Sequence, residues 1–211
     1  MEFIHLLLHL DRYLADVVAQ YHNYYYALLF IVIFCETGLI VTPFLPGDSL
    51  LFLSGAIAAT GNELNFTILA IIIFCAAFLG DNTNFTIGKT IGKKLFSNPN
   101  SKIFKQSILT QTHQIYEKHG AKAIILARFT PIMRTFVPFV AGIGRMHYQK
   151  YISYSIISSV LWVLIFVGGG YVFSNIPVVK DHLSLLILVV IFLSALPFAF
   201  IFARSIFCKK Q

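Results

Sequence analysis

Residues 151–179 form the longest run without a charged side chain in this sequence. A helix that crosses a bilayer needs about 20 consecutive apolar residues, and a soluble domain would interrupt so long a run with surface charges. Residues 183–203 form a second uncharged run, and residues 64–88 form a third that only Asp81 interrupts. The sequence therefore predicts an all-α, polytopic membrane protein with spanning helices over residues 64–88, 151–174 and 183–203.

The composition excludes several classes of function. Charged residues make up 12% of the chain, whereas soluble domains carry about 25%. This argues against a water-soluble enzyme, and the sequence contains no GxSxG, HExxH or P-loop motif, so we expect no enzymatic activity. The 3 cysteines lack metal-binding spacing, so no metal or cofactor is expected. The net charge of +7 fits cytoplasmic loops beside anionic lipids, and no nucleic-acid partner is expected.

Two further apolar regions, residues 27–60 and 121–146, are interrupted by helix-breaking residues. Each half is about 10–15 residues long, which is too short to span the hydrocarbon core. Non-helical backbone survives at that depth only where protein or water surrounds it. Both regions are therefore predicted to be re-entrant helical hairpins. The breaks are Pro43, Pro46 and Gly47 in the first region, and Pro131 and Pro138 in the second.

The remaining segments set the expected orientation in the membrane. Residues 1–20 mix apolar residues with charges, which is typical of an interfacial helix. Residues 98–119 lie in a lysine-rich loop and are expected to form an amphipathic helix on the cytoplasmic surface, the side on which the basic C-terminus is also expected. The two hairpins then enter from opposite faces, as in inverted-repeat transporters. The whole chain, residues 1–211, is predicted to be one membrane domain.

Four charged side chains fall within the two predicted hairpins: Glu36 and Asp48 in the first, and Arg128 and Arg134 in the second. An unpaired charge at the bilayer centre costs about 2.5–3.5 kcal/mol, so such residues are retained mainly for function. A planar guanidinium suits phosphate, and carboxylates can exchange protons. The two arginines are therefore predicted to bind a phosphate headgroup, and the two carboxylates to gate or to couple to protons. The predicted cavity lining comprises Asp81, Asn82, Asn84, Pro43, Pro46, Gly47, Thr135, Pro138 and Gly142.

Several motifs, in their order and spacing, resemble those of the DedA family, also described as SNARE-associated or VTT-domain membrane proteins. They are Cys35–Glu36–Thr37–Gly38 with Pro43 to Ser49, Gly80–Asp81–Asn82 with Phe85 to Gly88, Tyr116 to Gly120, Ala127 to Pro131 with Arg134–Thr135, and Pro138 to Gly142. The resemblance implies a multi-pass protein of the bacterial inner membrane with two facing re-entrant hairpins and a dependence on proton-motive force. It also implies that the family's functional acidic pair falls on Glu36 and Asp48, and its functional arginines on Arg128 and Arg134.

The leading hypothesis is a flippase that returns undecaprenyl phosphate, the lipid carrier that the resemblance implies, from the outer to the inner leaflet. Its partners are then this polyprenyl phosphate, membrane lipids and protons, and a homo-oligomer is compatible with the sequence. A second hypothesis is a proton-coupled exporter of small cations or drugs, whose cargo Glu36 and Asp48 bind. A third is a structural membrane protein, in which the charges only lock the hairpins together as salt bridges.

Overall fold

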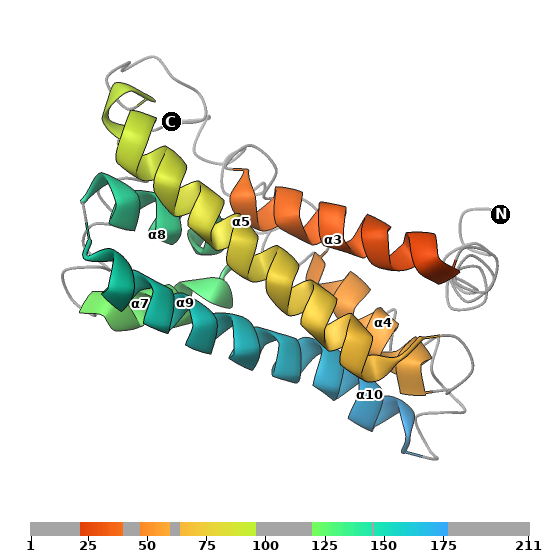
Figure 1. Cartoon of the computed structure of the whole chain (residues 1–211). Coiled ribbons are helices and arrows are strands. Elements are labelled where there is room, and N and C mark those ends of the chain that lie inside the picture. The colour runs from red at the N-terminus through yellow and green to blue at the C-terminus, as the bar shows by residue number, and fades with distance from the viewer. Residues whose placement is uncertain (1–21, 40–46, 60–63, 96–119, 145, 177–211) are drawn as a thin grey trace, which may run out of the picture. The chain divides into compact units, whose positions relative to one another are not determined.

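The computed structural model describes residues 22–39, 47–59, 64–95, 120–144 and 146–176, and all the elements in these ranges are helices (Figure 1). The longest helix, α5, spans Phe66–Leu95. The helix α9 continues through a π-helical turn, η2, into α10. The bounds of the other elements are α3 His22–Gly38, α4 Gly47–Ala59, η1 Gly120–Lys122, α7 Ala123–Arg128, α8 Pro131–Ile143, α9 Tyr148–Val163, η2 Leu164–Gly168 and α10 Gly169–Ser174.

Two of these helical segments, Phe66–Gly92 and Tyr148–Ser174, are long and apolar enough to cross a membrane. Their outward faces carry large apolar side chains, as lipid-facing helices do; exposed examples are Ile68, Ile71, Leu79, Ile156, Ile157, Val160 and Leu164. The prediction of an all-α protein of membrane type is confirmed at this level. The expected segments 64–88 and 151–174 overlap these helices, whereas the segments expected over 1–20, 98–119 and 183–203 lie outside the described residues.

The chain divides into two compact units, which we call the α4 unit and the α8 unit. The expectation from the sequence was one membrane domain. The described residues of the α4 unit are 22–26, 47–59, 64–69 and 165–176, and those of the α8 unit are 27–39, 70–95, 120–144 and 146–164.

Local sequence explains where several helices begin and end. The Asn65 side-chain oxygen accepts hydrogen bonds from the backbone N–H groups of Thr67 (2.9 Å) and Ile68 (3.1 Å), so it caps the start of α5. Pro131 occupies the start of α8, where a missing N–H costs no hydrogen bond. Helix α3 ends at Gly38.

In the α4 unit, α4 packs against η2 and α10 through glycines. A side chain at Gly55 would overlap the backbone carbonyl of Val167, and one at Gly170 would overlap that of Phe52. Backbones therefore touch directly, which is the way small residues let membrane helices approach each other. The contact holds α10 against α4.

In the α8 unit, glycines likewise allow the backbones of α5 and α8 to pack directly against each other. A side chain at Gly88 of α5 would overlap the carbonyl of Phe139, and one at Gly142 of α8 would overlap the carbonyl of Phe85. Gly80, earlier on α5, similarly leaves room for the Thr37 side chain of α3. These close approaches fix how α3 and α8 lie on α5, and so where their polar side chains meet.

A Gly142→Ala variant is expected to be less stable by about 1–3 kcal/mol, because the added methyl group meets rigid backbone of α5. Thermal unfolding in detergent micelles measures the change. Gly168→Ala is the matched control, since a side chain there would have nothing within 4 Å. Equal melting temperatures for the two variants would contradict the close packing of α5 and α8.

Candidate functional site

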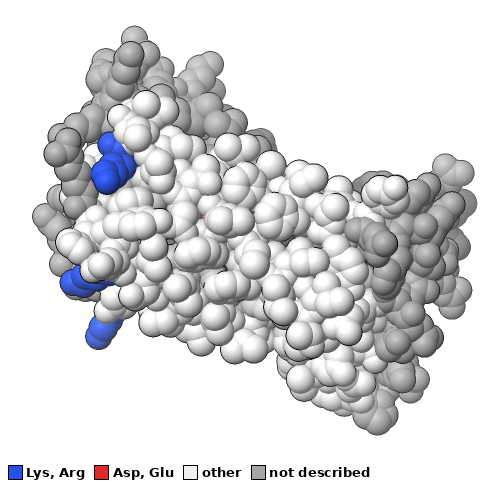
Figure 2. Space-filling view, viewed as in Figure 1, with Lys and Arg blue, Asp and Glu red and all other residues white. Residues whose placement is uncertain are grey.

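The buried charged side chains of the described residues all belong to the α8 unit. Glu36 lies at the end of α3, Asp81 in the middle of α5, Arg128 at the end of α7 and Arg134 near the start of α8. Each is at most 4% exposed. By contrast, Lys and Arg side chains gather at one side of the face visible in Figure 2, and exposed lysines of this unit include Lys89, Lys122 and Lys150. The unit therefore combines a charged interior with a basic surface region.

Arg134 forms an ion pair with Glu36. The guanidinium Nη2 of Arg134 donates to Oε1 of Glu36, and both side chains are buried. The pair links α8 to the last turn of α3. A buried pair of this kind is costly to break, because the remaining charge stays in a medium of low polarity.

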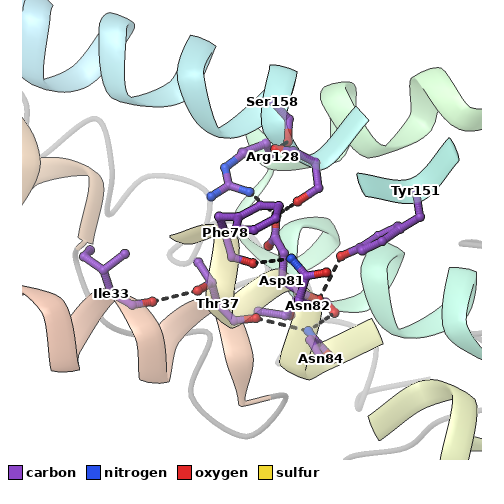
Figure 3. Close-up of polar contacts among 11 residues, drawn as sticks. Ile33, Thr37, Phe78, Asp81, Asn82, Asn84, Arg128, Tyr151 and Ser158 are labelled. Atoms are coloured by element: carbon purple, nitrogen blue, oxygen red, sulfur yellow. Dashed lines mark hydrogen bonds and ion pairs between the residues drawn. The ribbon is translucent and has the colours of Figure 1, made fainter. Parts of the chain in front are cut away.

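Arg128 forms a second buried ion pair, with Asp81 (Figure 3). Its Nη1 donates to Oδ2 of Asp81, and the hydroxyl of Ser155 on α9 donates to the same oxygen at 3.0 Å. The hydroxyl of Tyr151 donates to the backbone carbonyl of Asp81 at 2.8 Å. Asp81 is therefore held by α7 on one side and by α9 on the other.

The guanidinium of Arg128 has hydrogen-bond donors that its ion pair with Asp81 does not use. Its Nε and Nη2 atoms are buried and have no hydrogen-bond partner among the described residues. These two N–H groups lie on one edge of the guanidinium plane and point in parallel, which is the geometry that binds two oxygens of a phosphate or carboxylate. Arg128 therefore has two parallel N–H donors, on Nε and Nη2, that are available inside the protein to bind an oxyanion.

Both guanidiniums share one aromatic surface. The guanidinium carbon of Arg128 lies 5.0 Å from the ring centroid of Trp162, and that of Arg134 lies 5.4 Å from it. Trp162 is fully buried on α9. Cations within about 6 Å of an indole face are attracted to it, so the Trp162 ring stabilises both guanidiniums.

Asn84 on α5 organises the backbone around the two ion pairs. Its amide nitrogen donates to the carbonyls of Thr37 (3.1 Å) and Thr135 (2.6 Å). The Thr37 carbonyl belongs to the last turn of α3 and has no partner within that helix. Pro138 has no N–H to donate to the carbonyl of Arg134, the residue before Thr135 on α8. Asn84 therefore ties the end of α3 and the proline-containing part of α8 to α5.

The other predicted site residues are distributed as follows. Thr135 and Pro138 are buried on α8, and Gly142 lies against α5. Asn82 accepts a hydrogen bond from Tyr148 of α9. Gly47 and Asp48 begin α4, in the other unit, while Pro43 and Pro46 fall outside the described ranges. The carboxylate that pairs with Arg128 is that of Asp81, which the sequence suggested only as part of the cavity lining.

Sequence reasoning missed the polar face of α9. Tyr151, Ser155, Ser158, Ser159 and Trp162 recur at helical spacing and are all buried. That periodicity within an uncharged span is a usable signal, because a lipid-facing helix has no need of a polar stripe. A tryptophan at mid-helix is a second signal, since this residue favours membrane interfaces. Within the described ranges, no group of three or more His, Cys, Asp or Glu side chains could hold a metal ion.

Comparison with known proteins places the chain among its relatives. Residues 45–172 match the model of the VTT domain. The chain is 56% identical to Protein DedA of Escherichia coli K12, over 92% of this chain and 89% of that protein. It is 42% identical to an uncharacterized membrane protein of Mycobacterium leprae (79% and 74% covered) and 34% identical to inner membrane protein YghB of Escherichia coli K12 (84% and 80% covered).

No solved structure matches the chain. The VTT match covers more than half of the sequence, and the identity to Protein DedA extends over nearly all of it. The chain belongs to the DedA family of VTT-domain membrane proteins.

Proposed function

We propose that this protein is a flippase that returns undecaprenyl phosphate from the outer to the inner leaflet of the bacterial inner membrane, driven by proton-motive force. Arg128 and Arg134 bind the phosphate headgroup, and Glu36 and Asp48 gate the site or exchange protons. The observation that carries the proposal is the buried donor edge of Arg128, which has no hydrogen-bond partner among the described residues and shares the Trp162 ring with Arg134.

A donor edge of this kind is costly unless something occupies it. Each buried N–H group that is left unpaired costs about 1–3 kcal/mol of free energy, and the cost is larger for a charged group. An oxyanion that accepts both N–H groups of Arg128 recovers this cost, and the nearby Arg134 adds a second positive charge. A purely structural role requires only the two ion pairs and does not account for the unpaired Nε–Nη2 edge of Arg128.

The proposed membrane arrangement has two re-entrant hairpins, over residues 27–60 and 121–146. Helix α8 has 13 residues, about 20 Å at 1.5 Å per residue, against a hydrocarbon core of about 30 Å. Such a helix is too short to cross the core, so in a re-entrant hairpin the arginines beside its start would lie within the membrane, where the headgroup must pass. The exposed lysines of the α8 unit and the C-terminus face the cytoplasm in this arrangement.

The test is transport by the purified full-length protein in proteoliposomes with an imposed pH gradient. Outer-leaflet undecaprenyl phosphate should disappear faster than in protein-free vesicles, and collapse of the gradient should slow it. Undecaprenol, which has the same chain without the phosphate, is the control cargo and should not be moved. Movement of small cations without any movement of the lipid would favour the exporter hypothesis, and no movement of either cargo would favour a structural role.

A further inference from the structure

Asp81 is held unusually firmly for a residue with no assigned role in transport. Its side chain is 1% exposed and accepts hydrogen bonds from Arg128 and Ser155 on one oxygen, Oδ2. Its backbone carbonyl accepts a further hydrogen bond from Tyr151. Both the backbone and the carboxylate of Asp81 are thereby fixed relative to α9, and Figure 3 shows Arg128 and Tyr151 approaching it from different elements.

The way in which Asp81 contacts Arg128 matters more than the contact itself. A carboxylate can bind a guanidinium across the Nε–Nη2 edge through two hydrogen bonds, or at a single nitrogen. Asp81 uses one oxygen on Nη1, and the Nε–Nη2 edge keeps its two donors. The Ser155 hydroxyl donates to the same oxygen and helps to hold the carboxylate in this end-on position.

We propose that Asp81 is a positioning residue for anion binding: it orients the Arg128 guanidinium so that the Nε–Nη2 edge receives a phosphate oxyanion. The Trp162 ring supports one face of the guanidinium, and Asp81 fixes its rotation about the long axis of the side chain. Because Asp81 acts through Arg128, this role rests on the proposed phosphate site.

Electrostatics alone predicts the opposite effect of removing Asp81. A negative charge beside a binding site repels an incoming anion, so its loss should tighten anion binding if the charge were all that mattered. Positioning predicts weaker binding, because the freed guanidinium no longer presents its donor edge to the ligand. The sign of the affinity change for Asp81→Asn therefore separates the two roles.

The fluorescence of Trp162 can be used to follow anion binding in this experiment. Trp162 is the 1 tryptophan of the sequence and lies against both guanidiniums, so its fluorescence should respond to an anion bound there. The full-length protein in lipid nanodiscs is titrated with undecaprenyl phosphate, with inorganic phosphate and with undecaprenol. Response to both phosphates identifies the oxyanion as the ligand chemistry, and response to undecaprenyl phosphate alone identifies the lipid headgroup as its source.

Asp81→Asn should weaken phosphate binding about tenfold or more, the loss expected when one or two charge-assisted hydrogen bonds become misaligned. Ser155→Ala, which removes only the hydrogen bond to Oδ2, should weaken it severalfold. Ser158→Ala is the matched control, because this hydroxyl is equally buried on the same helix and donates to the carbonyl of Ser155 at 2.9 Å, not to Asp81. Its affinity should equal that of the unmodified protein.

Melting temperatures measured on the same samples separate positioning from a structural role. If the role of Asp81 is purely structural, Asp81→Asn lowers the melting temperature but leaves the phosphate affinity of the folded fraction unchanged. This result would overturn the proposal. Unchanged or tighter binding by Asp81→Asn would overturn it as well. If that variant does not fold, Ser155→Ala decides by the same comparison with Ser158→Ala. Phosphate binding without leaflet-to-leaflet movement would refute the transport proposal and leave the role of Asp81 intact.

Discussion

Arg134→Ala is expected to abolish transport of undecaprenyl phosphate and to destabilise the protein by about 3–5 kcal/mol. The loss of stability follows because Glu36 would remain as an uncompensated buried charge. The loss of transport follows because the phosphate loses one of its two proposed guanidinium partners. Unfolding in detergent micelles and flux in proteoliposomes measure the two effects on the same preparation.

The double variant Glu36→Leu/Arg134→Met separates these two effects. Replacing both members of a buried ion pair with hydrophobic residues of similar volume is often close to neutral for stability, so the double variant should regain most of the loss. Transport should stay absent, since the guanidinium is still missing. A double variant that regains both stability and transport would show that the pair serves only to join α3 to α8.

Arg128→Lys is expected to lower the transport rate at least about a hundredfold while keeping the positive charge, because two hydrogen bonds to a charged group, each worth about 1.5–3 kcal/mol, can no longer form in parallel. A lysine can still pair with Asp81, so stability should change less than in Arg134→Ala. The rate of undecaprenyl phosphate movement is measured well below lipid saturation, where the rate depends on binding, and is compared with the melting temperature of the same samples.

A loss of charge elsewhere in the α8 unit provides the control for Arg128→Lys. Lys122 lies at the end of η1, and its side chain is exposed, whereas Arg128 and Arg134 are buried. Lys122→Gln should transport within about twofold of the unmodified rate, since exposed charges contribute little across solvent. If Arg128→Lys behaves like this control, binding at Arg128 depends on charge alone and the fork geometry is irrelevant.

The sequence was sufficient to locate most of the charged interior. Glu36, Arg128 and Arg134 lie in apolar segments, where an ionisable side chain is unusual, and composition and run length predict a helical membrane protein. These inferences depend only on local chemistry along the chain. They needed no knowledge of which helices touch.

The pairing of charges could not be predicted in the same way. Arg128 and Asp81 are brought together by the way α7, α5 and α9 pack, and Gly88 and Gly142 set the neighbouring crossing of α5 and α8 through backbone contacts. A glycine in the sequence indicates close packing without naming its partner. The polar face of α9 was detectable by its periodicity, but the shared Trp162 ring requires two arginines from separate helices to converge on it.

The two ion pairs have a consequence for the response to membrane voltage. Among the described residues of the α8 unit, the buried ionisable side chains are two acids, Glu36 and Asp81, and two arginines, Arg128 and Arg134, so their formal charges sum to zero. When no ligand is bound, the membrane potential therefore exerts no net force on these four side chains. A phosphate headgroup adds negative charge, and moving one elementary charge against 100 mV costs about 2.3 kcal/mol. Inward passage toward the negative side of the membrane is therefore uphill for the loaded site, and each proton that accompanies the headgroup cancels one such increment.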